Sequence, residues 1–150
     1  MPDFQFLDPG QLVDDELELV LIETTQADPA RAWVPNYAFE MRVGAKKAGR
    51  INLRIGNPMK MVNHCGHIGY AVEPEFRGHH YAERACRLIL PIAEAHNQNP
   101  IWITCDPDNI ASKRTIENVG FEYVNTVPIP VNSEMYELGG RRVRRYRMVF

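Results

Sequence analysis

The hydrophobic pattern of the chain changes its period once, near the middle, and no other feature constrains the fold as much. Residues 67–72 form a short β-type segment that Pro74 ends. A polar turn with Gly78 follows, and apolar residues then recur at helical spacing, at Tyr81, Ala85, Leu88, Ile89 and Ile92. A strand, a turn and an amphipathic helix in direct succession exclude a helical bundle and a β-sandwich.

The flanking segments predict more strands and a second helix. Several stretches are rich in β-branched residues or alternate apolar with polar ones, which predicts strands over residues 17–25, 38–43, 50–55, 101–105, 121–131 and 142–150. A hairpin is expected across the turn 44–49, and the last two strands are expected to join through Gly139 and Gly140. This order indicates an α/β or α+β fold with a mixed sheet.

The helical segments have recognisable ends. Asp108 or Asn109 can cap a helix over residues 110–119. Pro91 lies inside the predicted helix that contains Tyr81 and Ile92, and it should kink this helix because the proline ring removes an N–H group. Residues 26–35 have room for no more than two helical turns.

Composition indicates one globular domain. The 150 residues carry 17 Lys and Arg against 19 Asp and Glu, a net charge of −2, and 45% are hydrophobic. No apolar run is long enough to span a membrane, and the N-terminus lacks the features of a secretory signal, so we expect a cytoplasmic location. Three widely spaced cysteines agree with a reducing compartment. The near-neutral charge gives no support for a protein that coats nucleic acid.

The turn before the central helix is a candidate phosphate site. A helix N-terminus leaves backbone N–H groups unpaired and carries partial positive charge, which suits a phosphate or pyrophosphate. Arg77 adds a permanent cation at the mouth of this turn. The alternative interpretation is a simple strand-to-helix corner with a surface arginine.

A second stretch, residues 106–121, strengthens the functional interpretation. Together with residues 68–82 it resembles the hallmark segments of the GNAT superfamily of N-acetyltransferases. The family's phosphate loop reads Arg/Gln-x-x-Gly-x-Gly/Ala, and its next helix resembles Asn-x-x-Ala/Ser followed by Gly-Phe. The matching residues are Arg77, Ala82, Asn109, Ser112, Gly120 and Phe121. Residues 66–70, Gly-His-Ile-Gly-Tyr, resemble the ribosomal-protein-acetyltransferase-like branch.

The resemblance covers about residues 38–124 and implies the architecture. We expect a mixed, mostly antiparallel central sheet, splayed open at a bulge and flanked by helices, with acetyl-CoA in the cleft. The single domain 1–150 would comprise a compact acceptor-side region 1–37, a CoA-binding core 38–124 and closing strands 125–150.

The resemblance also implies which residues hold acetyl-CoA. The pyrophosphate would be bound by backbone N–H groups of Arg77, Gly78, His79, His80, Tyr81 and Ala82. The edge of the strand around Tyr70 would pair with the pantetheine, and the N–H of Ala71 or Val72 would stabilise the oxyanion. A primary amine, of a small molecule or a peptide, would attack the thioester directly, with no metal involved.

Two positions depart from the family pattern. His80 stands where the loop usually has glycine, which requires a negative φ or an outward-pointing ring. Ile116 stands where many members have a tyrosine that protonates the leaving thiolate. Ser112 could supply the missing hydroxyl and Asn109 could orient the pantetheine or a water, although the two could equally serve only as a packing residue and a helix cap.

The general base has several candidates. Tyr70 lies on the strand beside the expected thioester, but an ordinary phenol pKa near 10 makes it a poor base. Glu40, Glu73 and His67 are alternatives that could act directly or through water.

Other polar clusters predict less. His64, Cys65 and His67 do not share one strand face and lack a fourth ligand, so we expect no metal site. The Arg-rich end, residues 141–147, could contact an acidic ligand or the acidic N-terminal region, whereas nucleic acid is disfavoured. Trp33 and Trp102 are interpreted as packing residues, with a substrate lid as an alternative for Trp33.

The sequence therefore predicts an acetyl-CoA-dependent N-acetyltransferase. A catalytically weak CoA-binding sensor or scaffold is the alternative, and a binder of an acidic ligand or nucleic acid is a third interpretation. Because residues 26–35 replace what are usually two helices, the acceptor cleft could be open or completed by a second subunit in a homodimer. The acceptor could be a small amine, a peptide N-terminus or a lysine.

Overall fold

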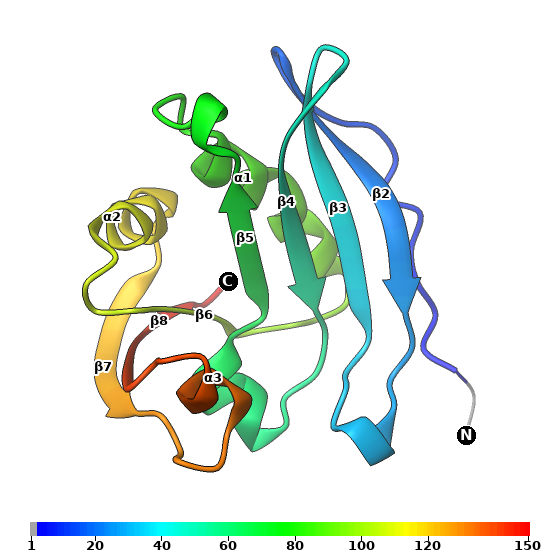
Figure 1. Cartoon of the computed structure of the whole chain (residues 1–150). Helices are drawn as coiled ribbons and strands as arrows, with labels where there is room; N and C mark the ends of the chain where they lie inside the picture. Colours follow the sequence, from blue (N-terminus) through cyan, green and yellow to red (C-terminus); the bar gives the residue numbers. More distant parts are fainter. Residues whose placement is uncertain (1–2) are drawn as a thin grey trace.

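Two antiparallel sheets form the centre of the protein in the computed structural model, which describes residues 3–150 (Figure 1). Met1 and Pro2, which open the predicted region 1–37, lie outside the described residues. The first sheet has the order β1-β2-β3-β4-β5, with strands at Leu12–Asp14, Leu17–Thr25, Asn36–Val43, Lys46–Arg54 and Ile68–Val72. The second has the order β6-β8-β7, with β6 at Ile101–Cys105, β7 at Glu122–Pro128 and β8 at Arg142–Met148.

The two sheets part between β5 and β6, and these strands meet at their beginnings. The backbone N of His67 donates to the carbonyl oxygen of Trp102 over 2.7 Å, and the N of Trp102 donates to Nδ1 of His67 over 2.9 Å. At Gly66 a Cβ atom would lie 3.0 Å from the Cα of Ile103, so glycine permits the close approach. We call this contact between His67 and Trp102 the clasp; beyond it the strands separate (Figure 1). Residues at the other end of β5 line a cleft.

The predicted fold class, a mostly antiparallel sheet flanked by helices, is confirmed. The two sheets part for a different reason from the expected one, which was a bulge. Register shifts interrupt the β2–β3, β3–β4 and β7–β8 ladders, whereas β5 pairs with β4 in regular register from Ile68 to Val72. The parting therefore begins where the contact between β5 and β6 ends, and not at a bulge in β5.

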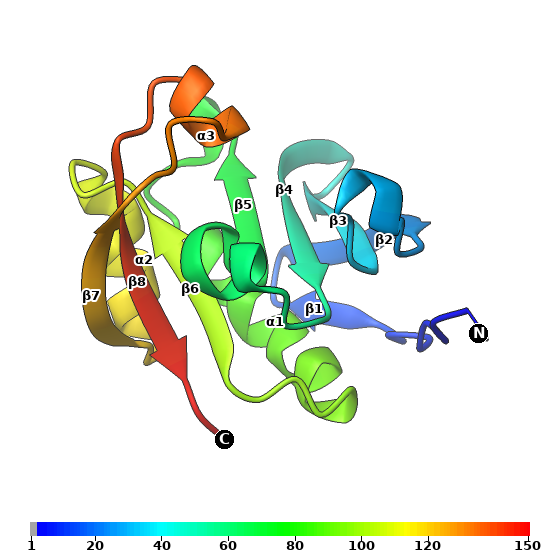
Figure 2. The same ribbon diagram turned by 90° about the horizontal axis from the view of Figure 1, so that it is seen from below.

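Helix α1 (Tyr81–Ala95) covers one face of the first sheet. Its fully buried Ala85, Ile89 and Ala93 belong to the same core as Phe39 of β3. The helix continues through Pro91, which is exposed and places its ring toward solvent. Helix α2 (Ile110–Val119) follows β6, and the one-turn helix α3 (Glu134–Glu137) lies on the opposite side of β5 from α1 (Figure 2).

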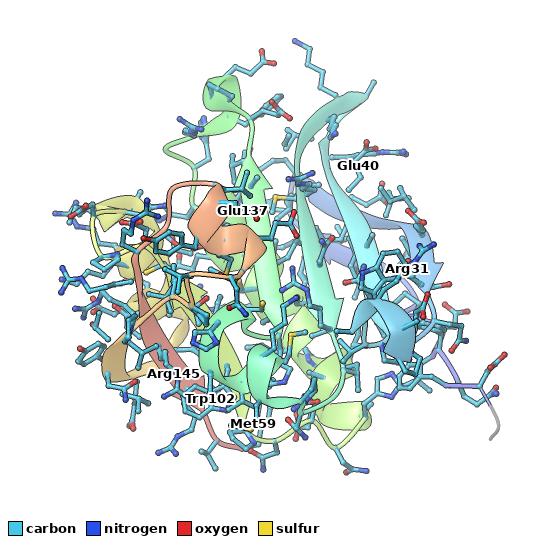
Figure 3. The ribbon with its side chains drawn as sticks, turned by 60° about the horizontal axis from the view of Figure 1, so that its bottom comes forward. Arg31, Glu40, Met59, Trp102, Glu137 and Arg145 are labelled. Atoms are coloured by element: carbon cyan, nitrogen blue, oxygen red, sulfur yellow. The ribbon has the colours of Figure 1, made fainter. Side chains whose placement is uncertain are left out.

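Strand β3 shows how the two faces of the first sheet differ. Tyr37, Phe39 and Met41 are fully buried toward α1, and the alternating residues, including Glu40, point the other way. In Figure 3, Glu40 projects from β3 and Glu137 from α3, while Arg145 lies beside Trp102. We call the surface opposite α1 the open face of the sheet.

Several boundaries differ from the prediction. The hairpin turn is Gly44–Ala45 alone rather than 44–49, because β4 begins at Lys46 and includes Gly49. A Cβ atom at Gly49 would lie 2.3 Å from the carbonyl oxygen of Ala71, so this glycine permits close strand packing rather than a turn.

Other differences involve short elements. Residues 26–35 contain one 3-10 turn, η1 (Pro29–Arg31), and β7 ends at Pro128 instead of 131. Four elements were not predicted: β1, the π-helical turn η2 (Met61–Cys65), the 3-10 turn η3 (Pro74–Phe76) and α3. No helix within residues 3–150 combines the length and apolar character needed to cross a bilayer.

Candidate active site

A cleft of about 560 Å³ lies between the open end of β5, the turn before α1 and the start of α2. It brings together ten of the predicted site residues: Tyr70, Ala71, Val72, Arg77, Gly78, His80, Tyr81, Ala82, Asn109 and Ser112. Its lining does not include His79, whose ring stacks on Tyr81 with centroids 5.3 Å apart. Phe76, Ala111 and Thr115 also line the cleft and were missed. The spacing of Ala111 and Thr115 around Ser112 on one helix face could have indicated them.

The N-terminus of α1 forms one end of this cleft. The N of Arg84 donates to the carbonyl oxygen of His80 as the first helical bond, so the preceding N–H groups have no helical partner. The side chain of the N-cap residue His80 makes no capping hydrogen bond to these N–H groups. Open space surrounds the Cα of Gly78, whose φ is +89°. This end of the cleft thus offers unpaired donors and the exposed cation of Arg77 to an anion.

Of the two conformations expected for His80, a negative φ or an outward-pointing ring, the structure shows the second. The φ of His80 is +60° and its ψ is +27°, in the left-handed region that glycine usually occupies. The ring points outward instead, with 71% of the side chain exposed, and Nδ1 lies 3.7 Å from a carboxylate oxygen of Glu83. The backbone at His80 therefore follows the path of a glycine loop, and the side chain does not fill the cleft.

The pairing of β5 with β4 decides which backbone groups face the cleft. The N of Arg54 donates to the carbonyl oxygen of His67 over 2.7 Å, at one end of the ladder. The N of Glu73 donates to the carbonyl oxygen of Ala48 over 2.8 Å, at the other end. Hydrogen-bonded residues alternate along an antiparallel strand, so the odd-numbered residues between them are also directed to β4.

It follows that Val72, and not Ala71, directs its N–H away from β4 and toward the cleft. The side chain of Arg77 is consistent with this direction, since its Nε donates to the carbonyl oxygen of Val72 over 3.3 Å. Tyr70 has the same orientation as Val72. Of the two oxyanion donors considered from the sequence, the register leaves Val72.

Two hydroxyl groups meet in the wall of the cleft. The phenol oxygen of Tyr70 lies 2.6 Å from the hydroxyl oxygen of Ser112. Burial raises the pKa of Tyr70 to about 12, against the smaller opposing effect of the hydrogen bond with Ser112. Tyr70 therefore keeps its proton at neutral pH, so it is unsuitable as a general base, and its O–H group is present to donate a hydrogen bond.

The start of α2 places Ser112 in this position. Asn109 is the N-cap, and its Oδ1 accepts from the N of Ser112 over 3.0 Å. Ile116, one turn further on, is 1% exposed and packs in the core. The helix thus has a buried aliphatic side chain at Ile116, and the phenol that contacts Ser112 comes from Tyr70 of β5.

The surroundings of His67 contradict its suggested role as a general base. It is fully buried at the clasp, Nδ1 accepts from Trp102, and Nε2 therefore carries the proton that it donates to the carbonyl oxygen of Gly56 over 2.8 Å. Burial also lowers the pKa of His67. Glu40 accepts from Nε of Arg42 and points to the open face, and Glu73 is exposed at the end of β5.

The remaining predicted clusters have structural surroundings. Residues 3–150 contain no group of three or more His, Cys, Asp or Glu side chains arranged to hold a metal ion. In the Arg-rich strand β8, Arg144 and Arg145 lie over the rings of Tyr123 and Trp102, at 4.1 and 4.2 Å from the ring centroids. Trp102 is a packing residue at 7% exposure, but Trp33 is 47% exposed and is not.

A comparison of the sequence with models of protein families identifies the class of protein to which this fold and cleft belong. A family model described as "Acetyltransferase (GNAT) domain" matches residues 5–122. The chain belongs to the GNAT family of acetyltransferases. A comparison with curated proteins found no match.

Solved structures share this fold at low sequence identity. The ribosomal-protein-S5-alanine acetyltransferase from Vibrio fischeri has a TM-score of 0.69 and 14% identity, over 93% of this chain and 96% of its own. RimL, a ribosomal L7/L12 alpha-N-protein acetyltransferase in complex with CoA, has a TM-score of 0.67 and 12% identity, over 93% and 98%. The self-immunity acetyltransferase MccE, in complex with acetyl-CoA and AMP, has a TM-score of 0.60 and 21% identity. That match covers 77% of this chain, which spans 61% of the MccE chain.

Proposed function

We propose that the protein transfers the acetyl group of acetyl-CoA to the α-amino group of a peptide or protein. The observation that carries the proposal is the meeting of Val72 and the Tyr70–Ser112 hydroxyl pair in one cleft. An oxyanion donor and a proton donor are the two groups that thioester aminolysis requires of a protein.

Binding would use the two ends of the cleft. The unpaired N–H groups at the start of α1, together with Arg77, suit the pyrophosphate of CoA. The edge of β5 near Val72 suits the pantetheine as an added strand, and Arg77 would release the Val72 carbonyl when the pantetheine amide takes its place. Asn109 lines the cleft between these ends.

The reaction would proceed by direct attack. The amine nitrogen bonds to the thioester carbonyl carbon while the N–H of Val72 stabilises the oxyanion. The carbon–sulfur bond then breaks, and the thiolate takes the proton of Ser112, which Tyr70 replaces. Water takes the proton that the amine loses, and later returns one to Tyr70, so the enzyme is restored.

The acceptor is the finer part of the proposal. RimL is described as an alpha-N-protein acetyltransferase and the Vibrio fischeri enzyme as acting on a ribosomal-protein alanine. These relatives support an α-amino acceptor over an antibiotic or a polyamine. We further propose that the whole chain acts as one cytoplasmic domain, with the open face of the first sheet on the acceptor side.

Calorimetry with acetyl-CoA and CoA tests the binding step, and thiol release in the presence of short peptides tests transfer. We expect micromolar binding of acetyl-CoA and thiol release that depends on a free peptide N-terminus. Peptides with an acetylated N-terminus are the matched control. Binding without thiol release would favour the CoA-binding sensor, and the absence of binding would overturn the proposal.

A further inference from the structure

A second cavity, of about 360 Å³, lies in the first sheet near the end of β4, at Arg54. Its floor is Asn52 and Arg54 of β4, which alternate with the fully buried Ile51 and Leu53 and therefore belong to the open face. Its walls come from the segment after η1, which contributes Trp33, and from η2 and the residue before it, Lys60. The cavity shares no lining residue with the CoA cleft.

The charge of this second cavity is one-sided. Arg54 and Lys60 line it, and its described lining includes no carboxylate. Arg54 is half-buried, its Nη1 donates to the carbonyl oxygen of Gly66 over 3.1 Å, and it takes part in none of the ion pairs found within residues 3–150. Burial lowers its pKa, so the charge has lost part of its hydration. A half-buried cation without an anion gains most from a ligand that supplies one.

We propose that this cavity binds a carboxylate of the amine acceptor, so that the enzyme prefers peptides with an acidic group close to the N-terminus. This inference rests on the proposed acetyl transfer and specifies its substrate class.

The position of Arg54 relative to the reaction centre fixes the spacing. Nη2 of Arg54 lies 3.3 Å from where a Cβ atom of Gly69 would be, so the guanidinium covers β5 at Gly69 on the open face. Val72, the oxyanion donor, is three residues further along β5, which corresponds to about 10 Å. An extended peptide advances about 3.4 Å per residue, so its third residue would reach Arg54 when its amine is at Val72.

On β5 itself, no large side chain stands between these two points on the open face. Tyr70 and Val72 direct their side chains to the CoA cleft on the α1 side, so the amine would approach from the open face. There β5 presents only Gly69 and Ala71 among its described residues. Trp33, nearly half exposed beside the cavity, offers an apolar surface to the stem of the acceptor.

Four tripeptides with a free N-terminus test the proposal. They are Ser-Ala-Glu-amide, Ser-Ala-Gln-amide, Ser-Ala-Ala-amide and Ser-Ala-Ala with a free C-terminal carboxylate. We expect kcat/KM to be at least about 10-fold higher for Ser-Ala-Glu-amide than for its Gln counterpart, the size of a charge-assisted hydrogen bond. The free-carboxylate tripeptide distinguishes a terminal carboxylate from a side-chain carboxylate as the group that is recognised.

Arg54→Gln and Lys60→Gln should reduce this preference, and Arg147→Gln is the matched control on the second sheet, where it should leave the preference unchanged. Lys60 is exposed, so its variant keeps the test valid if Arg54→Gln does not fold. Equal kcat/KM for the Glu and Gln peptides, or a preference that survives both substitutions, would overturn the proposal.

Calorimetry with the CoA-saturated protein separates this inference from the proposed function. Tighter binding of Ser-Ala-Glu-amide than of Ser-Ala-Gln-amide, lost in Lys60→Gln, would support the carboxylate site even if no acetyl group were transferred. Equal binding of the two peptides would contradict the carboxylate site even if acetyl transfer were efficient.

Discussion

The phenol of Tyr70 and the hydroxyl of Ser112 are 2.6 Å apart, although 42 positions separate the two residues in the sequence. The contact joins β5 of the first sheet to α2, which follows the first strand of the second sheet. It therefore links the two sheets at the middle of β5, three positions after the clasp residue His67. A leaving thiolate in the CoA cleft would meet two coupled hydroxyls rather than one.

Replacing Tyr70 by Phe removes the phenol and keeps the ring. We expect kcat to fall by about 10²-fold, while the affinity for acetyl-CoA stays nearly constant, because the proton is needed only as the thiolate leaves. Steady-state kinetics and calorimetry provide the two measurements. Ser112→Ala should have a similar effect, and the double variant should cost little more than either single variant, because the two hydroxyls act as a unit. Full additivity would contradict a shared proton route.

The ionisation of Tyr70 gives a pH dependence with a definite sign. Because burial raises its pKa to about 12, the folded protein keeps a proton that the unfolded chain loses near the ordinary value of 10.0. The resulting contribution to stability is complete below pH 10 and is lost as the pH rises toward 12. Burial also raises the pKa of Tyr37, Tyr81 and Tyr146, so ultraviolet titration of tyrosinate should show several late-ionising groups, and Tyr70→Phe should remove one of them. Ionisation of all tyrosines together near pH 10 would contradict the burial argument.

Proline substitutions test the orientation of β5 directly. Val72→Pro removes the N–H that points to the cleft, so it should keep the fold and lower kcat by about 10²-fold. Ala71→Pro removes an N–H that bonds to β4, so it should destabilise the protein by about 3 kcal/mol. Thermal melts and thiol-release rates measure both effects. If the two variants exchanged these phenotypes, the register would be assigned to the wrong residues.

The left-handed backbone at His80 predicts a stabilising substitution. His80→Gly should raise the stability by about 1 kcal/mol, because glycine adopts a positive φ without the clash of a Cβ atom. His80→Ala keeps the Cβ atom and should give no such gain. His79→Gly, where φ is not positive, is a matched control that should lower the stability. Retained acetyl-CoA affinity in His80→Gly would show that the imidazole is dispensable for binding.

The clasp residue His67 predicts sensitivity to acid. Burial lowers its pKa, so below about pH 6.5 the unfolded chain binds a proton that the folded protein excludes, and stability falls as the pH falls. His67→Asn should cost about 3 kcal/mol at pH 7 and make the stability less dependent on pH between 5 and 7. His96, whose pKa burial also lowers, contributes in the same direction and is tested by His96→Asn. An unchanged pH profile in His67→Asn would rule out this role.

The sequence predicted best the elements whose pattern and end signals agree. Strand β5, helix α2 with its cap Asn109, and the turn at Gly78 appear where the sequence placed them, because local spacing determines each of them. By contrast, η2 and α3 have one turn each, too short to produce a periodic pattern, and depend on tertiary contacts. Gly49 resembled a turn signal, but it is required by the packing of β5 against β4.

The candidate site was predictable in its members and less so in their relationships. Motif spacing identified most residues of the cleft, whereas the contact of Tyr70 with Ser112 depends on the angle between β5 and α2, which no local pattern encodes. Histidine is a common catalytic residue type, but His67 has a structural role, since both of its ring nitrogens form hydrogen bonds. The sequence could not show this, because burial and hydrogen bonding depend on the tertiary structure.

The clasp at His67 has a mechanical consequence. Strands β5 and β6 behave as two arms joined at a pivot, and the five residues of β5 make an arm of about 17 Å. A small rotation at the pivot becomes a much larger displacement at Val72, at the end of β5, relative to Ser112 of α2, which follows β6. The buried imidazole of His67, at the pivot, therefore sets the width of the gap into which the thioester must fit, although no substrate touches it.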